Sequence, residues 1–133
     1  MPSEGLKDHE ITETIIGCSM KVPSYFGPGF PEIIYQRALR IELEKELLVC
    51  FCEVERDIIY EDRLIGKRKL DLIVEDKKLV ELKAVTELDN GCDAQVINYL
   101  RIFDIEVGLF INFSADSLKF RRFVNSKKSV KPI

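Results

Sequence analysis

Two short runs of alternating apolar and polar residues, separated by a polar turn, constrain the fold of this chain more than any other feature. The runs are 68–74 and 79–85, and the segment Glu75-Asp76-Lys77-Lys78 lies between them. Because side chains alternate across a strand, this pattern predicts a β-hairpin with one apolar face turned toward a core. That face is expected to carry the apolar residues of both runs, which are Leu70, Leu72, Val74, Val80, Leu82 and Ala84.

The opposite face of the predicted hairpin carries Asp71, Glu81 and Lys83. A turn near residues 76–77 would place Asp71 roughly across from Glu81, so that two carboxylates and an ammonium meet on a sheet. Close carboxylates repel each other unless a cation lies between them, and a hard ion such as Mg²⁺ prefers oxygen ligands. Lys83 could then orient a nucleophilic water or offset charge on a phosphate. The alternative is a surface ion-pair cluster, because charged alternating strands are common.

Helical and strand-like segments surround this hairpin. Helical spacing predicts three helices, at 11–22 with Pro23 ending it, at 31–47 with Pro31 at its first position, and at 92–103. Strand-like runs are expected at 49–54, at 58–60 and at 106–113. A turn at 64–66 is expected to lead into the hairpin strand at 68–74. Residues 114–133 are expected to hold one more short element. Helices followed by strands, a helix and a strand predict a mixed α+β domain.

The length of 133 residues suits a single domain. We expect a flexible leader at 1–9, one domain at 10–124 and a polar tail at 125–133. With 46% hydrophobic and 32% charged residues, the composition excludes wholesale disorder. No apolar run approaches the length of a membrane helix, and the start of the chain lacks the apolar stretch of a secretory signal. A cytoplasmic protein without a membrane partner is expected.

The net charge of −3 argues against indiscriminate nucleic-acid binding through a global positive field. Basic residues nevertheless gather in Lys67-Arg68-Lys69 and in a second set of Lys119, Arg121, Arg122, Lys127, Lys128 and Lys131. Each cluster predicts either a local basic groove or a solvated edge. The four cysteines form no CxxC pair, and His9 is the single histidine, so zinc and iron–sulfur sites are poorly supported. Buried residues or free thiols are expected instead.

Two helices could supply further site residues. Glu32 lies in the first turn of its helix, where a carboxylate stabilises the positive helix end, yet it is also free to bind a metal. Gln95 and Tyr99 are four residues apart and project from one helix face. Gln95 can hydrogen-bond to a phosphate, and Tyr99 can stack or donate its hydroxyl.

Taken in order, Asp71, Glu81-x-Lys83 and Gln95-x-x-x-Tyr99 resemble the motifs of the PD-(D/E)xK nuclease superfamily, in particular its RecB-like and lambda-exonuclease-like branches. The segment Gly29-Phe-Pro-Glu32-Ile-Ile-Tyr35 resembles the motif that names the GxxExxY protein family, which is assigned to that superfamily. The segments 27–29, 80–85 and 109–113 look similar to the same family, so the resemblance covers about residues 10–124. Pro31 departs from the expected aliphatic residue but is compatible with a helix start.

The resemblance implies a restriction-endonuclease-like core, with a mixed central sheet flanked by helices. It also implies a site, in which Asp71, Glu81 and Glu32 would bind Mg²⁺ or Mn²⁺. Lys83 would be the catalytic lysine and would act with Asp71 and Glu81. The residues implied to support the site or to contact substrate are Gln95, Tyr99 and Tyr35.

The first hypothesis is therefore a Mg²⁺-dependent nuclease that hydrolyses phosphodiester bonds of DNA by activating water. The alternative is a catalytically idle module of the same fold that binds nucleic acid or a protein partner. A short chain with little room for a DNA-gripping arm, and the negative net charge, favour that alternative. A homo-oligomer could build the groove that one small subunit lacks. A purely structural domain with a charged sheet face is the third interpretation.

Overall fold

The computed structural model describes residues 8–85, 90–113, 118–126 and 130–132. Within these ranges the helices are α1 (Asp8–Phe26), α2 (Glu32–Lys45) and α3 (Asn90–Ile102). The strands are β1 (Cys50–Tyr60), β2 (Arg63–Val74), β3 (Lys78–Lys83), β4 (Val107–Phe113), β5 (Leu118–Asn125) and β6 (Val130–Pro132). The order confirms the predicted α+β class.

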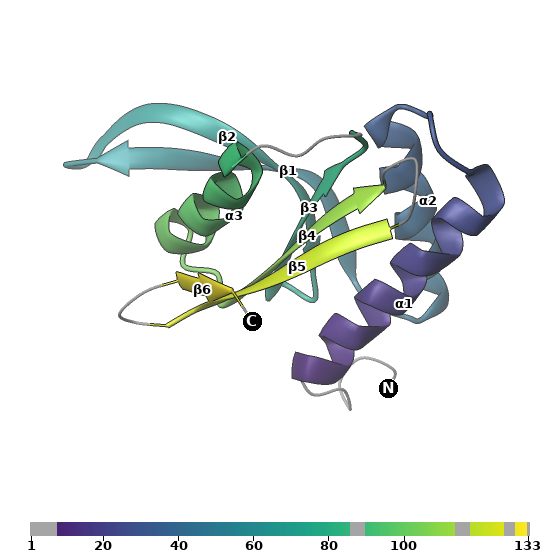
Figure 1. Ribbon diagram of the computed structural model, residues 1–133. Helices are drawn as coiled ribbons and strands as arrows, with labels where there is room; N and C mark the ends of the chain where they lie inside the picture. Colours follow the sequence, from purple (N-terminus) through teal and green to yellow (C-terminus); the bar gives the residue numbers. More distant parts are fainter. Residues whose placement is uncertain (1–7, 86–89, 114–117, 127–129, 133) are drawn as a thin grey trace.

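The strands form one mixed sheet in the order β1-β2-β3-β4-β5-β6. Neighbouring strands are antiparallel except β3 and β4, which are parallel and are joined through α3. Helices α1 and α2 lie on one side of the sheet and α3 lies on the other (Figure 1). All seven residues of β4 are buried, as expected for a central strand that is covered on both faces. The mixed sheet with flanking helices is the restriction-endonuclease-like core that the motifs implied.

A hydrophobic cluster fills each side of the sheet. The cluster under α1 and α2 includes Ile15, Tyr35, Leu39, Leu72, Val80, Leu82, Leu109 and Ile111. The cluster under α3 includes Leu70, Ile73, Leu79, Val96, Leu100, Phe110 and Phe123. Helix α3 approaches β4 closely at Gly108, where an added Cβ would lie 3.0 Å from side-chain atoms of Val96 and Leu100. The face expected to be polar is therefore itself covered by a helix.

The placement of Leu70 corrects the expected hairpin face. Leu72 packs under α1 and α2, whereas Leu70, two residues earlier on the same strand, packs under α3. Alternation breaks at Asp71, because the pairing between β1 and β2 skips the position where Asp71 would face Glu53. Glu53 has a φ of 52°, in the left-handed region. Leu70 changes faces at this point, although the register between β1 and β2 is the same before and after it.

Beyond this irregularity β1 and β2 leave the sheet as a long two-stranded ribbon, which projects past α3 in Figure 1. β3 pairs with β2 only at 72–74, so the ribbon has no third strand. The turn lies at Glu61 and Asp62, which both have positive φ, rather than at 64–66 as predicted. The runs 49–54 and 58–60 thus belong to one strand. The expectation that the chain has little room for an arm is wrong.

Several predicted boundaries also differ from the structure. Helix α1 continues one turn past Pro23, because a proline this near the helix end removes only one backbone hydrogen bond. The helix ends at Gly27, whose N–H donates to the Pro23 carbonyl at 2.7 Å and whose φ is 72°. α1 begins inside the segment expected as a leader, and β6 lies inside the expected tail. Pro31 precedes the first residue of α2 as its N-cap.

All four cysteines are free thiols, as expected, and Cys18 and Cys50 are buried. None of the helices in the described part of the chain is long and apolar enough to cross a membrane.

Candidate active site

The carboxylates of Asp71 and Glu81 lie opposite each other on β2 and β3. Just beyond the last backbone pair of the two strands, each carboxylate accepts a hydrogen bond from a backbone N–H of the other strand. The β2–β3 ladder has Leu72 opposite Val80 as its last pair. One step further, the Asp71 N–H donates to Glu81 Oε1 at 3.1 Å. In return, the Leu82 N–H donates to Asp71 Oδ2 at 2.7 Å. These reciprocal bonds confirm that Asp71 lies across from Glu81, and they fix both side chains at the point where the strands diverge.

Glu81 is almost fully buried, with 6% of its surface exposed. Burial and, next in size, the negative charge of Asp71 raise the pKa of Glu81 to about 9. The hydrogen bond from the Asp71 backbone N–H opposes this shift, and the charge of Glu32 adds to it. A carboxyl in such surroundings is costly to ionise unless a positive charge enters the cluster.

Glu32 reaches the same cluster from the first turn of α2. Burial raises the pKa of Glu32, and so does the negative charge of Asp71, whereas Lys83 lowers it. A side-chain hydrogen bond also joins Glu32 to Asp71 and favours the protonated form of Glu32. The structure therefore brings together three carboxyl groups from α2, β2 and β3, with the Lys83 ammonium close enough to lower the pKa of Glu32.

The donor set fits a hard divalent cation. Three carboxyl groups supply oxygen ligands, and the raised pKa values of Glu32 and Glu81 show that they compete for positive charge. Among the described residues no three acidic, histidine or cysteine side chains already form a ready-made ligand set. The reason is visible in the hydrogen bonds, since Asp71 engages Glu32 and the Leu82 N–H and Glu81 engages the Asp71 N–H. A cation would compete with these hydrogen bonds for the carboxylate oxygens.

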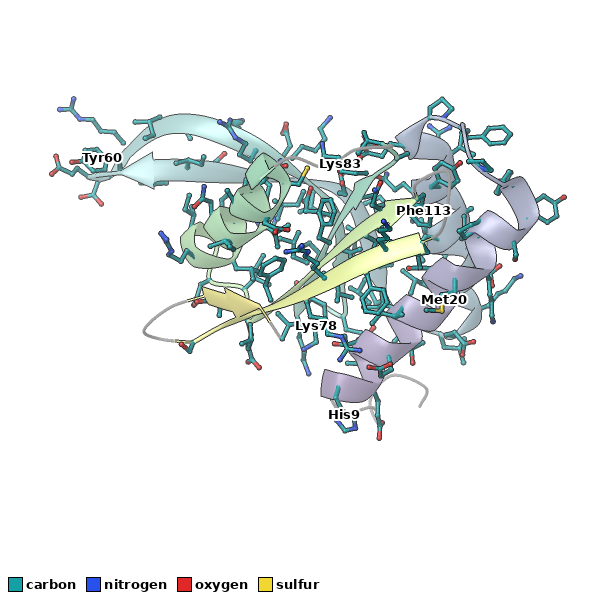
Figure 2. The ribbon with its side chains drawn as sticks, in the orientation of Figure 1. His9, Met20, Tyr60, Lys78, Lys83 and Phe113 are labelled. Atoms are coloured by element: carbon teal, nitrogen blue, oxygen red, sulfur yellow. The ribbon has the colours of Figure 1, made fainter. Side chains whose placement is uncertain are left out.

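Lys83 lies at the last position of β3, one strand residue beyond Leu82 (Figure 2). Its side chain is only partly buried. Since residues two apart on a strand share a face, Lys83 lies on the same face as Glu81. The site thus combines buried acids with a cation at the more open end of the strand.

The segment before α2 explains why glycine and tyrosine flank Glu32. Gly29 has a φ of 97°, which other residues rarely adopt. The Tyr35 hydroxyl donates to the Gly27 carbonyl at 2.7 Å and accepts from the Phe30 N–H at 3.2 Å. The Tyr35 ring is fully buried and stacks on the Phe113 ring, with the two ring centroids 4.8 Å apart. Tyr35 therefore supports the loop that leads into Glu32, and its burial keeps it from contacting substrate.

Gln95 and Tyr99 lie on α3, the layer that covers the Glu81 face. Gln95 Nε2 donates to the Tyr99 hydroxyl at 2.9 Å, and Tyr99 is nearly buried in the cluster under α3. The two side chains lie on one face of the helix, as predicted, and they form a hydrogen bond with each other. Tyr99 packs with α3 against the sheet, and Gln95 is held by Tyr99.

Asn112 received no role from its sequence, although it holds the strand end next to Lys83. It is the parallel-strand partner of Lys83 and is 1% exposed. Its Oδ1 accepts from the Val85 N–H at 3.1 Å, and its Nδ2 donates to the Val85 carbonyl at 3.0 Å. The amide thereby fixes the chain just after Lys83. The available signal was one polar residue inside an otherwise apolar run, Val107–Phe113.

The mixed sheet, the helices on both faces and the acidic cluster beside a hairpin lysine define a restriction-endonuclease-like domain. The sequence profile of the PD-(D/E)XK nuclease superfamily matches residues 9–123, and the chain belongs to that superfamily. No curated protein is significantly similar in sequence. Among solved structures, the crystal structure of SSO0001 resembles this chain with a TM-score of 0.54 and 23% sequence identity. The likeness covers 71% of this chain and 50% of SSO0001, and it supports the fold alone.

Proposed function

We propose that this protein is a divalent-metal-dependent nuclease that hydrolyses phosphodiester bonds of DNA. The observation that carries the proposal is the meeting of Glu32, Asp71 and Glu81 beside Lys83, in a chain that belongs to a nuclease superfamily. Acidic groups are held together here at a cost that a structural ion-pair cluster would avoid. Such a cost is typical of sites that work with a cation.

The groups that would hold Mg²⁺ or Mn²⁺ are the carboxylates of Asp71 and Glu81, with Glu32 completing the set. A bound divalent ion would stabilise charge on the phosphate and make water more acidic. Glu81, whose pKa is raised to about 9, would lose its proton to engage the ion, so binding and proton release would be coupled.

The remaining roles belong to the side chains of this chain. Lys83 would place its positive charge against the scissile phosphate, where negative charge grows in the transition state. Asp71 keeps the backbone of Leu82 in place through its 2.7 Å hydrogen bond, and Asn112 keeps the chain after Lys83 in place. Because both sides of Lys83 are pinned, its ammonium can act without reorganising the strand.

The same geometry supports a finer assignment to the GxxExxY family of the superfamily. Gly29 permits the loop, Glu32 carries the acid, and Tyr35 ties the loop to the core. Each residue of the motif therefore has a physical task in presenting Glu32 to Asp71. Gln95 and Tyr99 would orient α3 over the site, and Gln95 is the more exposed of the two toward substrate.

The test is a cleavage assay on linear, circular and branched DNA, with Mg²⁺ or Mn²⁺ and with EDTA. We expect metal-dependent cleavage by the wild type and strongly reduced cleavage by Lys83→Ala. A wild type that binds DNA but never cuts it with either metal would overturn the nuclease proposal in favour of a binding module. Comparison of linear with circular DNA would separate exonuclease from endonuclease action.

A further inference from the structure

The ribbon formed by β1 and β2 is the largest feature of the molecule that the acidic cluster does not use. We define the arm as residues 55–69, which pair only with each other and project past α3 (Figure 1). Val54 and Leu70 anchor its base in the cluster under α3. Figure 2 shows Tyr60 at the far tip of the arm, away from the body of the domain.

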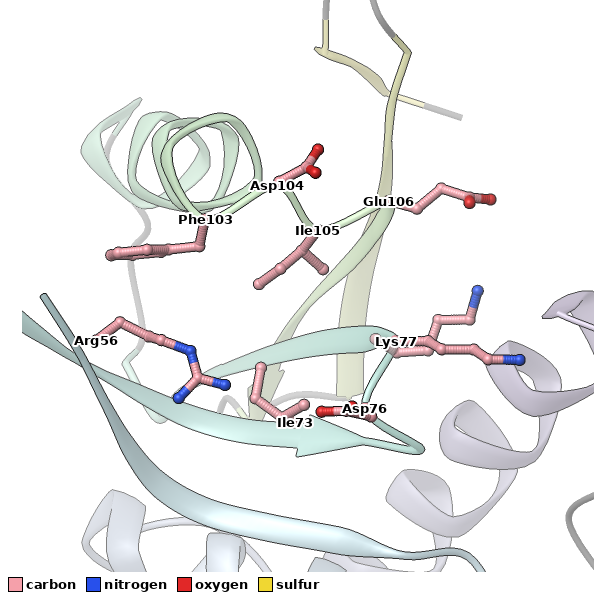
Figure 3. A pocket seen from close by; sticks show the side chains of 9 residues that line it. Arg56, Ile73, Asp76, Lys77, Phe103, Asp104, Ile105 and Glu106 are labelled. Carbon is pink, nitrogen blue, oxygen red and sulfur yellow. The ribbon is translucent and has the colours of Figure 1, made fainter. Parts of the chain in front are cut away.

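The register of the arm sorts its charged residues onto two different faces. Arg56 lies opposite Arg68, and Tyr60 lies opposite Arg63. Alternate residues of β1 share a face, so Arg56 and Tyr60 lie on the same face as Val54, which packs toward α3. Arg68 and Arg63 lie opposite them, because the register between the strands shifts by one residue between Ile58 and Ile59. Figure 3 shows Arg56 on this side of the ribbon, beside Phe103 from the end of α3. We call this surface the arginine face.

The other face of the arm is neutral in charge. Lys67 lies opposite Asp57, with its ammonium 4.0 Å from the carboxylate, and Lys69 lies opposite Glu55. The two remaining acids, Glu61 and Asp62, occupy the turn at the tip. We call this neutral surface the paired face. The side chains of the basic run 67–69 therefore alternate between the two faces of the arm: both lysines lie on the paired face, and Arg68 lies on the arginine face.

The arginines of the arginine face lack carboxylate partners within the described part of the chain. Arg56 Nη1 donates to the backbone carbonyl of Glu55, and Arg68 Nη1 donates to that of Lys67. Like charges directly opposite each other destabilise a strand pair. Two exposed arginines that face each other in this way suit an external anion that both can contact.

We propose that the arginine face binds the phosphate backbone of duplex DNA and guides it to the acidic cluster. This inference rests on the proposed function for the identity of the ligand. Arg68 and Arg63 precede Asp71 on the same strand by three and eight residues, which correspond to about 10 Å and about 26 Å. The longer reach matches the rise of about eight base pairs. Single strands are bound mainly through aromatic stacking, for which this face offers only Tyr60.

Two other surfaces are weaker candidates for the same ligand. On β5, Arg121 already pairs with Asp93 at 2.8 Å, and Arg122 pairs with Glu13. A cavity of about 290 Å³ lies at the opposite end of β3 from Lys83, and Arg56 itself lines it together with Asp76, Asp104 and Glu106. Neither surface offers two arginines that face each other without carboxylate partners among the described residues.

The test compares two double variants that remove the same charge from opposite faces of the arm. R56A/R68A changes the arginine face, and K67A/K69A is the matched control on the paired face. Binding of each protein to a labelled duplex of about 20 base pairs is measured in Ca²⁺ over a range of salt concentrations. The slope of log K against log salt is negative, and each lost phosphate contact should reduce its magnitude by about 0.9, so R56A/R68A should reduce it by about 2.

If both proteins bind equally at 1 M salt, this difference in slope corresponds at about 50 mM salt to a loss of about 200- to 400-fold in duplex affinity for R56A/R68A. The control should lose less than about threefold, and a single strand should show a smaller difference between variants. Equal losses in the two variants, or an unchanged R56A/R68A, would overturn the proposal. So would a change in oligomeric state in R56A/R68A by sedimentation, which would assign the arm to a protein partner. Thermal melting should be unchanged or slightly raised, because like-charge repulsion is removed.

The outcomes for the arm and for the nuclease proposal are distinguishable. Binding is measured without turnover, and cleavage is measured separately in Mg²⁺. If the wild type cuts DNA while R56A/R68A binds as well as the wild type, the arm proposal fails and the nuclease stands. If R56A/R68A alone loses duplex binding but no protein cuts, the arm proposal stands and the nuclease fails.

Discussion

Replacing Glu81 with glutamine tests whether the acidic cluster is costly to the folded protein. In the unfolded chain the pKa of Glu81 has its ordinary value of 4.5, and in the folded protein burial raises it to about 9. Between these values the folded state binds more protons than the unfolded state, so the stability of the wild type should fall as pH rises. This contribution is fully present below pH 4.5 and is lost as pH climbs toward 9.

The size of the effect follows from the same two values. At pH 7 the difference of 2.5 units above the unfolded pKa corresponds to about 3 kcal/mol. Glu81→Gln keeps the side-chain oxygen that accepts from the Asp71 N–H but removes the ionisable group. In EDTA at pH 7 we therefore expect the variant to be more stable than the wild type by about 1–3 kcal/mol, because the glutamine NH₂ group must itself find partners.

Urea unfolding in EDTA at pH 5 and pH 8 measures this difference. The urea midpoint of the wild type should fall between the two pH values by more than that of Glu81→Gln, and at pH 8 the variant should unfold at about 1 M more urea. Glu44→Gln, which changes an exposed carboxylate outside the cluster, is the control and should differ little from the wild type. A Glu81→Gln protein less stable than the wild type at pH 8 would refute the reasoning and favour a structural ion-pair cluster.

Three further substitutions test other parts of the site. Asp71→Asn should abolish the rise in melting temperature that Mg²⁺ or Mn²⁺ gives the wild type, while melting in EDTA stays level or rises; retained stabilisation by metal would place the ion elsewhere. Tyr35→Phe leaves the Gly27 carbonyl and the Phe30 N–H without their partner, so chemical denaturation should show a loss of about 1–3 kcal/mol. Asn112→Ala leaves the N–H and the carbonyl of Val85 without their hydrogen-bond partner, so amide hydrogen exchange at Val85 should become faster. Unchanged exchange would show that Asn112 does not hold the end of β3 in place.

The pairing of Asp71 with Glu81 could be predicted because it depends on local rules alone. A polar turn between two alternating runs sets the register, and the register sets which side chains meet. Glu32 required the resemblance to a known family, because an acid in the first turn of a helix has a sufficient local explanation. Sequence spacing alone does not show that Glu32 lies near Asp71. The fold shows it, since it brings the first turn of α2 to the end of the hairpin where β2 and β3 diverge.

The arm and the face switch at Leu70 could not be read from the pattern. A ribbon exposed on both faces has no buried side, so its residues carry charge and apolar groups without a clear period of two. The switch depends on a left-handed Glu53, and glutamate has no special preference for that conformation. The expected polar face of the hairpin is likewise covered by α3, because tertiary packing, rather than the strand itself, decides which faces are buried.

Single-turnover cleavage of a labelled DNA duplex by wild type and Lys83→Ala decides whether Lys83 is the catalytic lysine of a nuclease. Lys83 is placed where its charge matters in the transition state, so Lys83→Ala in Mg²⁺ should cut at least about a hundredfold more slowly. Its equilibrium affinity for the same duplex in Ca²⁺ should stay within about twofold of the wild type. Equal cleavage rates in the two proteins, or a wild type without any metal-dependent cleavage, would contradict the account.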